Sequence, residues 1–271
     1  MNDDPARTDE PGRRPRMAVH KFSSCDGCQL ALLNAGDALL RLAERVELVH
    51  FAEAGPVDPE AAVDIALIEG SVSTAEDRAR IVRIRAHSRF LVTLGACATA
   101  GGIQALRNFT DGDEWLSSVY ARPEYISSLA NVSPIRDHVH VDLELWGCPV
   151  SGHQVLTAIG SLLAGAPPAV PDESLCLECK RQQAVCVMVT RGAPCLGPVT
   201  RTGCGALCPR FGRDCYGCYG PAEHPNTQAL GRRFAGLGLV DEAIARRFHF
   251  INSQAPVFLE AGQRRRGNHD D

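Results

Sequence analysis

The chain has 271 residues, of which 45% are apolar, so it can form one large domain or two smaller ones. No apolar run approaches the roughly 18 residues of a membrane span, and we therefore do not expect an integral membrane protein. The 28 basic and 32 acidic residues give a net charge of -4, which lacks the basic surplus typical of nucleic-acid-binding proteins.

The N-terminal half of the sequence alternates between strand and helix patterns. Residues 1–15 are charged and without periodicity, which predicts a disordered leader. The apolar spacing then predicts strands at 16–22, 46–52, 63–68, 90–94 and 139–146, and helices at 29–43, 76–87 and 152–163. Alternation of this kind is typical of βαβ units. We therefore expect an α/β domain with a doubly wound, mostly parallel sheet over residues 16–165.

One interval inside this domain is longer than a simple crossover requires. Residues 101–136 contain Trp115, Tyr120 and Tyr125, and we expect a partly helical excursion there that faces a partner.

The pattern breaks at 164–168, where we place a domain boundary. Residues 171–221 hold eight of the twelve cysteines and almost no periodicity, so we expect a bound group to organise an irregular domain at 166–225. Helical patterns return at 226–234 and 241–248, within a helical segment predicted for 226–262. Residues 263–271 are predicted to be a charged tail.

Twelve cysteines could form disulfides, hold metal or lie inert in the core. The arginines of residues 13–16 superficially resemble an export signal, but the following residues 17–24 contain charge and hydroxyl groups and cannot supply its apolar core. We therefore expect a cytoplasmic protein. Because structural disulfides are rare in a reducing cytosol, this location favours metal or cluster ligation.

The first set of cysteines is Cys25, Cys28, Cys97 and Cys148. All four follow predicted strands, and parallel sheets place their ligands at the carboxyl ends of strands. Cys25 and Cys28 also begin a predicted helix, whose N-terminal amides favour anionic thiolates. An isolated CxxC pair fits zinc, a redox dithiol or a cluster equally well. Four converging thiolates form a closed site, which means structural zinc or an electron-carrying iron-sulfur cluster.

The second set lies within 43 residues and comprises Cys176, Cys179, Cys186, Cys195, Cys204, Cys208, Cys215 and Cys218. Eight ligands make two four-cysteine sites, and a pair of zinc ribbons is the simplest alternative. The irregular spacing and the glycines and prolines after the ligands favour iron-sulfur clusters. The spacing does not determine which four cysteines share a site, since two-cluster proteins often exchange a ligand.

Four motifs in chain order resemble those of the [NiFe] hydrogenase small subunit, a family that includes the 20 kDa-type subunit of NADH:quinone oxidoreductase. They are residues 22–29 (FSSCDGCQ), 68–71 (IEGS), 95–98 (GACA) with Gly101 and Gly102, and 147–149 (GCP). Residues 194–199 (PCLGPV) and 215–218 (CYGC) resemble the small, delta-type subunit of cytosolic NAD(P)-coupled hydrogenases, also called sulfhydrogenases.

The resemblance implies a flavodoxin-like domain that holds a proximal [4Fe-4S] cluster on Cys25, Cys28, Cys97 and Cys148. It implies two further iron-sulfur clusters on the second set, most simply all [4Fe-4S]. The centre that splits H2 would lie in a separate [NiFe] large subunit, so no catalytic residue is expected in this chain. Electrons would pass to flavin- and NAD(P)-binding diaphorase and ferredoxin-like subunits. A related complex with a deazaflavin or quinone acceptor, or a zinc-stabilised scaffold without redox function, remains an alternative.

Several residues near the motifs allow two interpretations. Glu69 ends a strand that lies beside Cys25 and Cys28 in a 2-1-3-4-5 strand order. It is either a carboxylate of a proton path or subunit interface, as the matching family motif suggests, or a simple acceptor of backbone N–H bonds. His153 is expected on a helix surface.

Trp146 is expected to be a core or interface aromatic. Arg201, Arg210 and Arg213 lie among the C-terminal cysteines and are expected to be solvated surface charges.

Overall fold

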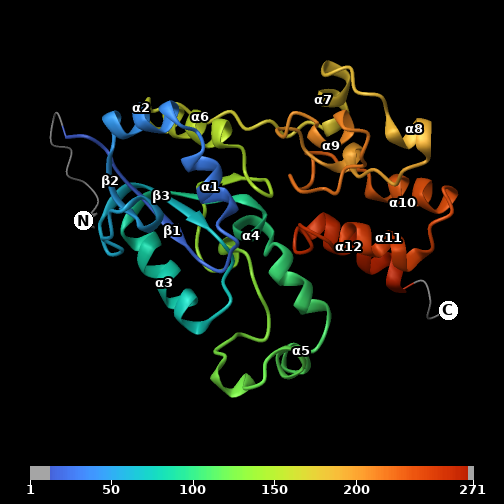
Figure 1. Ribbon diagram of the computed structural model, residues 1–271, viewed down its shortest axis with the longest axis horizontal. Coiled ribbons are helices and arrows are strands. Elements are labelled where there is room, and N and C mark those ends of the chain that lie inside the picture. The colour runs from blue at the N-terminus through green and yellow to red at the C-terminus, as the bar shows by residue number, and fades with distance from the viewer. Residues whose placement is uncertain (1–12, 268–271) are drawn as a thin grey trace, which may run out of the picture.

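A five-stranded parallel sheet organises the N-terminal part of the chain (Figure 1), and the computed structural model describes residues 13–267. The strand order is β2-β1-β3-β4-β5, and every neighbouring pair is parallel. The strands are β1 (Arg16–Lys21), β2 (Glu47–Phe51), β3 (Val63–Glu69), β4 (Ser88–Leu94) and β5 (Leu143–Leu145). The predicted doubly wound α/β fold is therefore confirmed, including its strand order.

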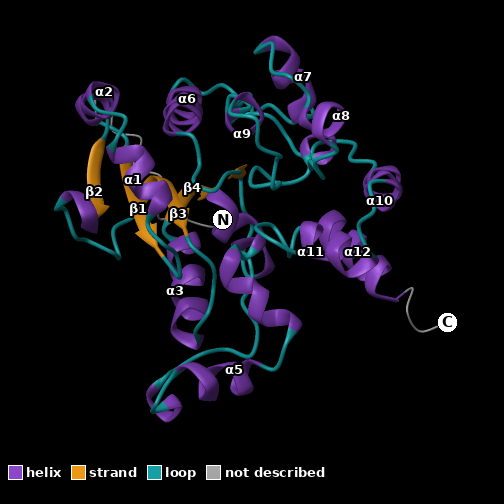
Figure 2. Cartoon of the chain, turned by 45° about the vertical axis from the view of Figure 1, so that its right-hand side comes forward, coloured by secondary structure: helices purple, strands orange, loops and turns teal. Residues whose placement is uncertain are grey.

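Helices cover both faces of the sheet because the strand side chains alternate between two apolar cores. Figure 2 shows α1 (Gly27–Leu33), α2 (Asp37–Arg45) and α6 (Gly152–Leu163) on the side opposite α3 (Ala75–Ala86). The first core joins α1, α2 and α6 to Met17, Val19, Ile65, Leu67, Val92 and Leu94. The second joins α3 to Ala18, Ala66, Ile68 and Leu91.

The structure corrects three sequence predictions in this part. The single helix predicted at 29–43 is two helices, because the chain turns between them at Gly36 with φ 56°. The strand predicted at 139–146 is only the three residues of β5. The end of the predicted leader is bound to the sheet, since Arg13 donates a 3.1 Å hydrogen bond to Asp64. Residues 1–12 of that leader lie outside the described residues.

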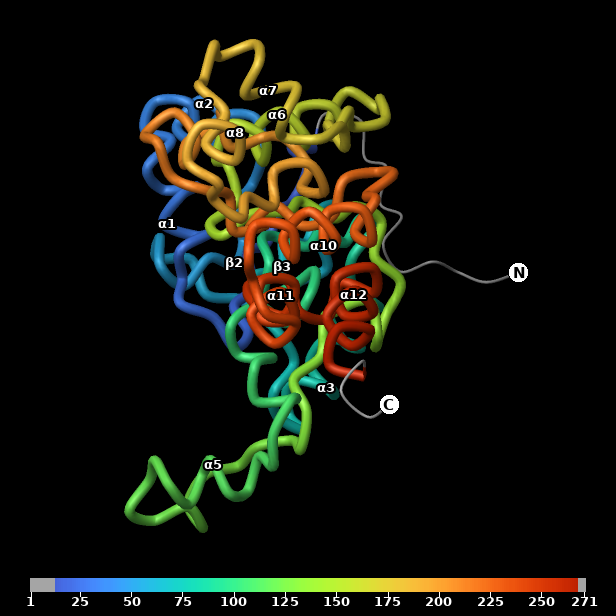
Figure 3. The backbone as a smooth tube through the Cα atoms, turned by 90° about the vertical axis from the view of Figure 1, so that its right-hand side faces the viewer, coloured from blue at the N-terminus to red at the C-terminus, as the bar shows by residue number. Residues whose placement is uncertain are grey.

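The interval at 101–136 is partly helical, as predicted. After β4 come α4 (Gly95–Ala100), a 3-10 helix at Ile103–Phe109, α5 (Gly112–Val119) and two short 3-10 turns at Pro123–Tyr125 and Ile135–Asp137. Figure 3 shows α5 and the turns around it extending away from the rest of the chain.

The C-terminal part consists of short helices and loops around its own apolar core. The helices are α7 (Leu175–Arg181), α8 (Val187–Arg191), α9 (Leu207–Arg210), α10 (Thr227–Gly236), α11 (Asp241–Phe248) and α12 (Pro256–Arg266), with a 3-10 turn at Gly197–Val199. Helix α12 extends into the predicted tail, of which residues 268–271 lie outside the described residues. No helix within residues 13–267 is long and apolar enough to cross a membrane.

Trp146 joins the two parts. It directly follows β5 but belongs to the C-terminal core, and the guanidinium of Arg201 lies 5.1 Å from the centre of its ring. A side chain at Gly220 (φ 72°) would place its Cβ 2.1 Å from the Trp146 ring, so this close approach requires glycine. The cysteine-rich segment is thereby held against the end of the sheet.

Candidate functional site

The first set of cysteines gathers at the carboxyl edge of the sheet. Cys25 lies in the loop after β1, and Cys28 lies in the first turn of α1. Cys97 lies in α4, directly after β4, and Cys148 follows β5. The Cys25 and Cys148 residues are exposed, whereas Cys28 is buried. Three segments far apart in sequence thus bring the four thiols to one edge, which opens to solvent.

These four thiols also lie close enough to repel one another as thiolates. The pKa of Cys97 is raised to about 11, mainly by burial and also by the charges of Cys148 and Cys25. Burial raises the pKa of Cys28 even more, with additional contributions from Glu69, Cys97 and Cys148. The anionic form of the set therefore needs positive charge from a bound group, which the irons of a cluster would supply.

Two glycines leave space for the sulfur atoms. A Cβ at Gly95 (φ 78°) would lie 2.3 Å from Sγ of Cys28. A Cβ at Gly102 (φ 64°) would lie 2.6 Å from Sγ of Cys97. Both positions combine a left-handed backbone with a sulfur atom well inside van der Waals contact of the added Cβ, so only glycine fits there. The backbone is thus shaped around the thiols, which is the cradle that a bulky inorganic core requires.

Glu69 occupies the N-terminus of α1. Its carboxylate accepts hydrogen bonds from the backbone N–H groups of Cys28 (3.0 Å) and Gln29 (3.2 Å), and its side chain is buried. These contacts match the simpler interpretation of Glu69, in which its carboxylate accepts backbone N–H bonds. They also change one expectation: at least two amides at this helix end bind a carboxylate and are not directed at the thiolates.

The second set of cysteines forms two neighbouring groups whose thiolate charges also act across their boundary: the charge of Cys204 raises the pKa of Cys179, and that of Cys195 raises the pKa of Cys215. The thiols of the first group are those of Cys176, Cys179, Cys186 and Cys195. The thiols of the second group are those of Cys204, Cys208, Cys215 and Cys218. The groups touch where the N–H of Cys215 donates to Sγ of Cys195 at 3.2 Å.

Contacts also connect the second set to the first. The pKa of Cys218 is raised to about 12, mainly by burial, and the charges of Cys204 and Cys148 contribute to the rise. Tyr219 is buried where the charges of Cys204, Cys218 and Cys28 all raise its pKa, burial being the main cause. The three groups of thiols therefore form one continuous series.

The donor set fits iron-sulfur clusters. Within residues 13–267, no three His, Cys, Asp or Glu side chains are arranged to hold one metal ion. The observed groups consist of thiols only, which are the ligands of both iron-sulfur clusters and structural zinc sites.

Sequence reasoning missed two residues of these sites. Gln104 donates from Nε2 to the Ser23 carbonyl at 2.7 Å, and its Oε1 accepts from Sγ of Cys97 at 3.4 Å. It therefore ties the loop of Cys25 to Cys97. Tyr219 is the other, and its position directly after Cys218 was the available signal.

Among the other candidates, Arg201 corrects a prediction. Burial against Trp146 lowers its pKa, and it donates to the Pro221 carbonyl at 3.1 Å, so it is not a solvated surface charge. Arg210, Arg213 and His153 are exposed, as expected.

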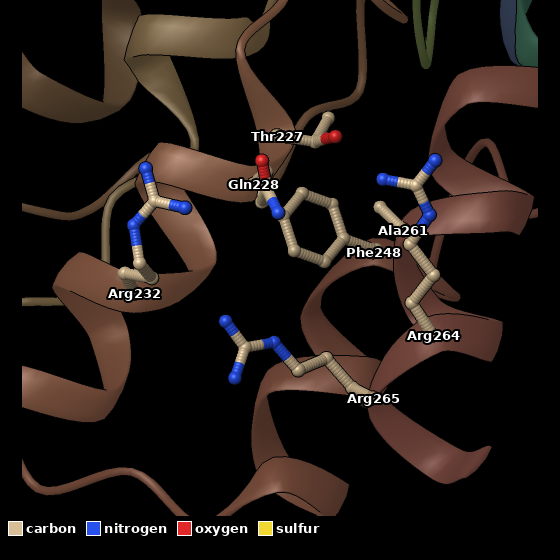
Figure 4. A pocket seen from close by; sticks show the side chains of 7 residues that line it. All are labelled: Thr227, Gln228, Arg232, Phe248, Ala261, Arg264 and Arg265. Atoms are coloured by element: carbon tan, nitrogen blue, oxygen red, sulfur yellow. The ribbon is translucent and has the colours of Figure 1, made fainter. Parts of the chain in front are cut away.

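A cavity of about 520 Å³ lies between α10, α11 and α12, away from the thiols. Figure 4 shows Arg232, Arg264 and Arg265 around the ring of Phe248. Arg264 is paired with Glu260 at 2.5 Å and Arg265 with Asp241 at 2.8 Å, so much of the positive charge is neutralised. No cysteine lines this cavity, and it is not part of the thiol series.

Comparisons with known proteins agree with the fold and the motifs. The family described as NADH ubiquinone oxidoreductase, 20 Kd subunit, matches residues 25–162. Sulfhydrogenase 2 subunit delta of Pyrococcus furiosus is 35% identical, over 86% of this chain and 97% of that protein. One subunit of the F420-non-reducing hydrogenase vhu of Methanocaldococcus jannaschii is 31% identical, over 77% of this chain and 82% of that protein. A chain of the solved NAD+-reducing [NiFe]-hydrogenase in the H2-reduced state is 31% identical, with a TM-score of 0.54, over 59% of this chain and 96% of that one.

Proposed function

The chain belongs to the family of the NADH ubiquinone oxidoreductase 20 kDa subunit as a hydrogenase small subunit, and we propose that it carries electrons through three iron-sulfur clusters. The electrons would move between the Ni-Fe centre of a separate large subunit and NAD(P)-reducing diaphorase and ferredoxin-like subunits. When bound, such clusters take up and release single electrons. The observation that carries the proposal is the continuous series of three thiol groups that begins at the exposed edge of the sheet.

The proximal cluster would be a [4Fe-4S] cluster on Cys25, Cys28, Cys97 and Cys148. The mutual charge effects of these thiols support this assignment, as do the glycine positions beside Cys28 and Cys97. The exposed Cys25 and Cys148 residues would then be covered by the large subunit.

The other two clusters would lie in the proposed domain at 166–225. We assign the middle position to the group of Cys204, Cys208, Cys215 and Cys218, since Cys218 is influenced by Cys148. We assign the distal position to the group of Cys176, Cys179, Cys186 and Cys195, which touches the middle group through Cys195 and reaches the surface at the exposed Cys186.

The acceptor proposed is NAD(P), on the strength of the likeness to a chain of an NAD+-reducing [NiFe]-hydrogenase. A complex with another acceptor, a deazaflavin or a quinone, is the second candidate, since a relative of similar identity is a subunit of a coenzyme F420 hydrogenase.

Metal analysis of the anaerobically purified chain tests the cluster assignment. Three [4Fe-4S] clusters predict about twelve irons and twelve sulfides per chain. About three zincs without sulfide would instead indicate the scaffold alternative. Co-purification with a nickel-containing subunit that reduces NAD(P) with H2 tests the hydrogenase function and its acceptor.

A single substitution separates the proximal cluster from the rest. Cys148→Ser should abolish H2-driven NAD(P) reduction while the two C-terminal clusters stay visible by EPR. His153→Ala is the matched control, because His153 lies five positions further along and is exposed on α6. Full turnover in Cys148→Ser would contradict the assignment.

A further inference from the structure

The segment of residues 110–128, here called the arm, has no core of its own. Among the described residues, none of its side chains belongs to any of the three buried apolar clusters. Its side-chain hydrogen bonds are local and reach no further than the carbonyls of Arg107 and Leu129. Figure 3 shows it extending away from the body of the chain.

Large apolar side chains on the arm are exposed. Trp115 is 54% exposed, Tyr120 48% and Tyr125 75%, and Val119 on the same helix is 64% exposed. Aromatic side chains of this kind are the residues that contribute most binding energy at protein interfaces. Several of them on one short segment without a core indicate a surface that binds another protein.

The arm is also acidic. It contains Asp111, Asp113, Glu114 and Glu124 but only one basic residue, Arg122. In the described structure Arg122 pairs with Glu124 at 3.9 Å, which leaves the acidic residues around the first turn of α5 without compensation from the arm itself. The complementary surface would therefore be an apolar groove with a basic rim.

The root of the arm lies at the edge of the proximal thiols. Asn108 and Val132 close the root with two hydrogen bonds of 2.7 and 2.9 Å. Just before it, Gln104 contacts both Sγ of Cys97 and the carbonyl of Ser23, two residues before Cys25. A partner that covers the exposed edge at Cys25 would therefore lie beside the root of the arm.

We propose that the arm binds the large subunit of the complex and inserts Trp115, Tyr120 and Tyr125 into an apolar groove of that subunit. This inference rests on the proposed function, because the partner is the subunit that would cover the proximal cluster. The arm extends that interface beyond the edge of the sheet. It forms a second contact region that does not involve the thiols.

The test is the affinity of the cluster-loaded chain for the purified large subunit. The triple variant Trp115→Ala, Tyr120→Ala, Tyr125→Ala should raise Kd by roughly tenfold or more, since truncation of one aromatic anchor commonly costs that much. The control variant Leu40→Ala, Val240→Ala removes side chains that are 65% and 67% exposed outside the arm, and it should leave Kd unchanged. Both variants should keep their iron content and melting temperature.

An unchanged Kd for the arm variant would overturn the inference while leaving the proposed function intact. Failure of the wild-type chain to bind any nickel-containing subunit would instead contradict the proposed function. The two results are thus distinguishable.

Fluorine NMR supplies an independent readout. The chain has two tryptophans, and 5-fluorotryptophan labelling would give one signal from exposed Trp115 and one from Trp146, which is 6% exposed. Addition of the large subunit should remove the solvent isotope shift of the Trp115 signal and leave that of Trp146 unaltered. Protection of Trp115 by concentrating the chain alone would identify a second copy as its partner and refute the assignment to the large subunit.

Discussion

Substitution of Gly95 by alanine tests the geometry of the proximal site directly. The new Cβ would lie 2.3 Å from Sγ of Cys28 and 3.0 Å from the carbonyl oxygen of Gly147. Non-bonded contacts between carbon atoms are optimal at about 3.5 to 4.0 Å, and sulfur is larger than carbon. The sulfur or the backbone must therefore move by at least about 1 Å. Metal-ligand distances tolerate about 0.2 Å.

The backbone conformation adds a cost that can be measured separately. Gly95 has φ 78°, and a left-handed conformation costs a non-glycine residue roughly 1–2 kcal/mol. Gly36→Ala is the matched control, because Gly36 has φ 56° but nothing within 4 Å of the added Cβ. The control carries the conformational cost alone, whereas Gly95→Ala also displaces Cys28.

Iron content distinguishes the two variants. The Gly95→Ala chain should contain about four irons fewer than wild type, with the loss confined to the proximal EPR signal. The Gly36→Ala chain should retain all of its iron and lose only about 1–3 kcal/mol in urea unfolding, because its φ of 56° and ψ of -128° lie in a sparsely populated region. Equal iron content in the two variants would show that the space at Gly95 is not required for the proximal cluster, and the reasoning would fail.

Three further substitutions test the surroundings of the sites. Glu69→Gln should lower the free energy of unfolding by about 1–2 kcal/mol, because a charged acceptor of two backbone N–H bonds becomes neutral. Urea unfolding measures this difference, and an unchanged free energy would contradict the capping role of Glu69. His20→Phe should remove a pH dependence: burial lowers the pKa of His20 from 6.5 to about 3, so only the unfolded chain binds the proton between these values. The wild-type free energy of unfolding is then unaffected by His20 above pH 6.5 and falls by up to about 1.4 kcal/mol per pH unit below it. If the free energies of wild type and His20→Phe depend equally on pH between about pH 7.5 and 5.5, this reasoning is refuted. Gly220→Ala should destabilise the chain by more than about 3 kcal/mol, because the new Cβ would overlap the Trp146 ring. Gly205→Ala is the control, since Gly205 has a similar φ and nothing within 4 Å of the added Cβ. Equal decreases in melting temperature for the two variants would contradict the packing of Gly220 against Trp146.

The sheet was predictable because its strands carry a strong and local signal. β3 and β4 are buried on both faces, so their apolar runs stand out from the surrounding sequence. The helix predicted at 29–43 failed for the opposite reason. Apolar spacing continues across Asn34, Ala35 and Gly36, and only the backbone at Gly36 breaks the helix. Periodicity reports which residues face the core and not whether one helix or two present them.

The proximal thiols were also accessible from sequence, since each follows a strand and parallel strands end at one edge. The arrangement of the other eight was not. Cys195 and Cys215 are 20 positions apart and nevertheless contact each other, while Cys186 and Cys195 share a group across nine positions. Segments without regular secondary structure provide no rule that converts sequence distance into spatial distance, so this grouping required the structure.

Packing accounts for how the cysteine-rich segment positions its thiols. Apolar residues directly beside the ligands enter the C-terminal core: Leu175 precedes Cys176, Val187 follows Cys186 and Leu196 follows Cys195. Their buried partners include Phe234, Phe248 and Phe258 of α10, α11 and α12. Burial of each neighbour fixes the backbone from which the adjacent thiol projects. A bound group is therefore not alone in organising residues 171–221, because the helices that follow them supply the core. Burial beside that core also raises the pKa values of the Cys176 and Cys195 thiols.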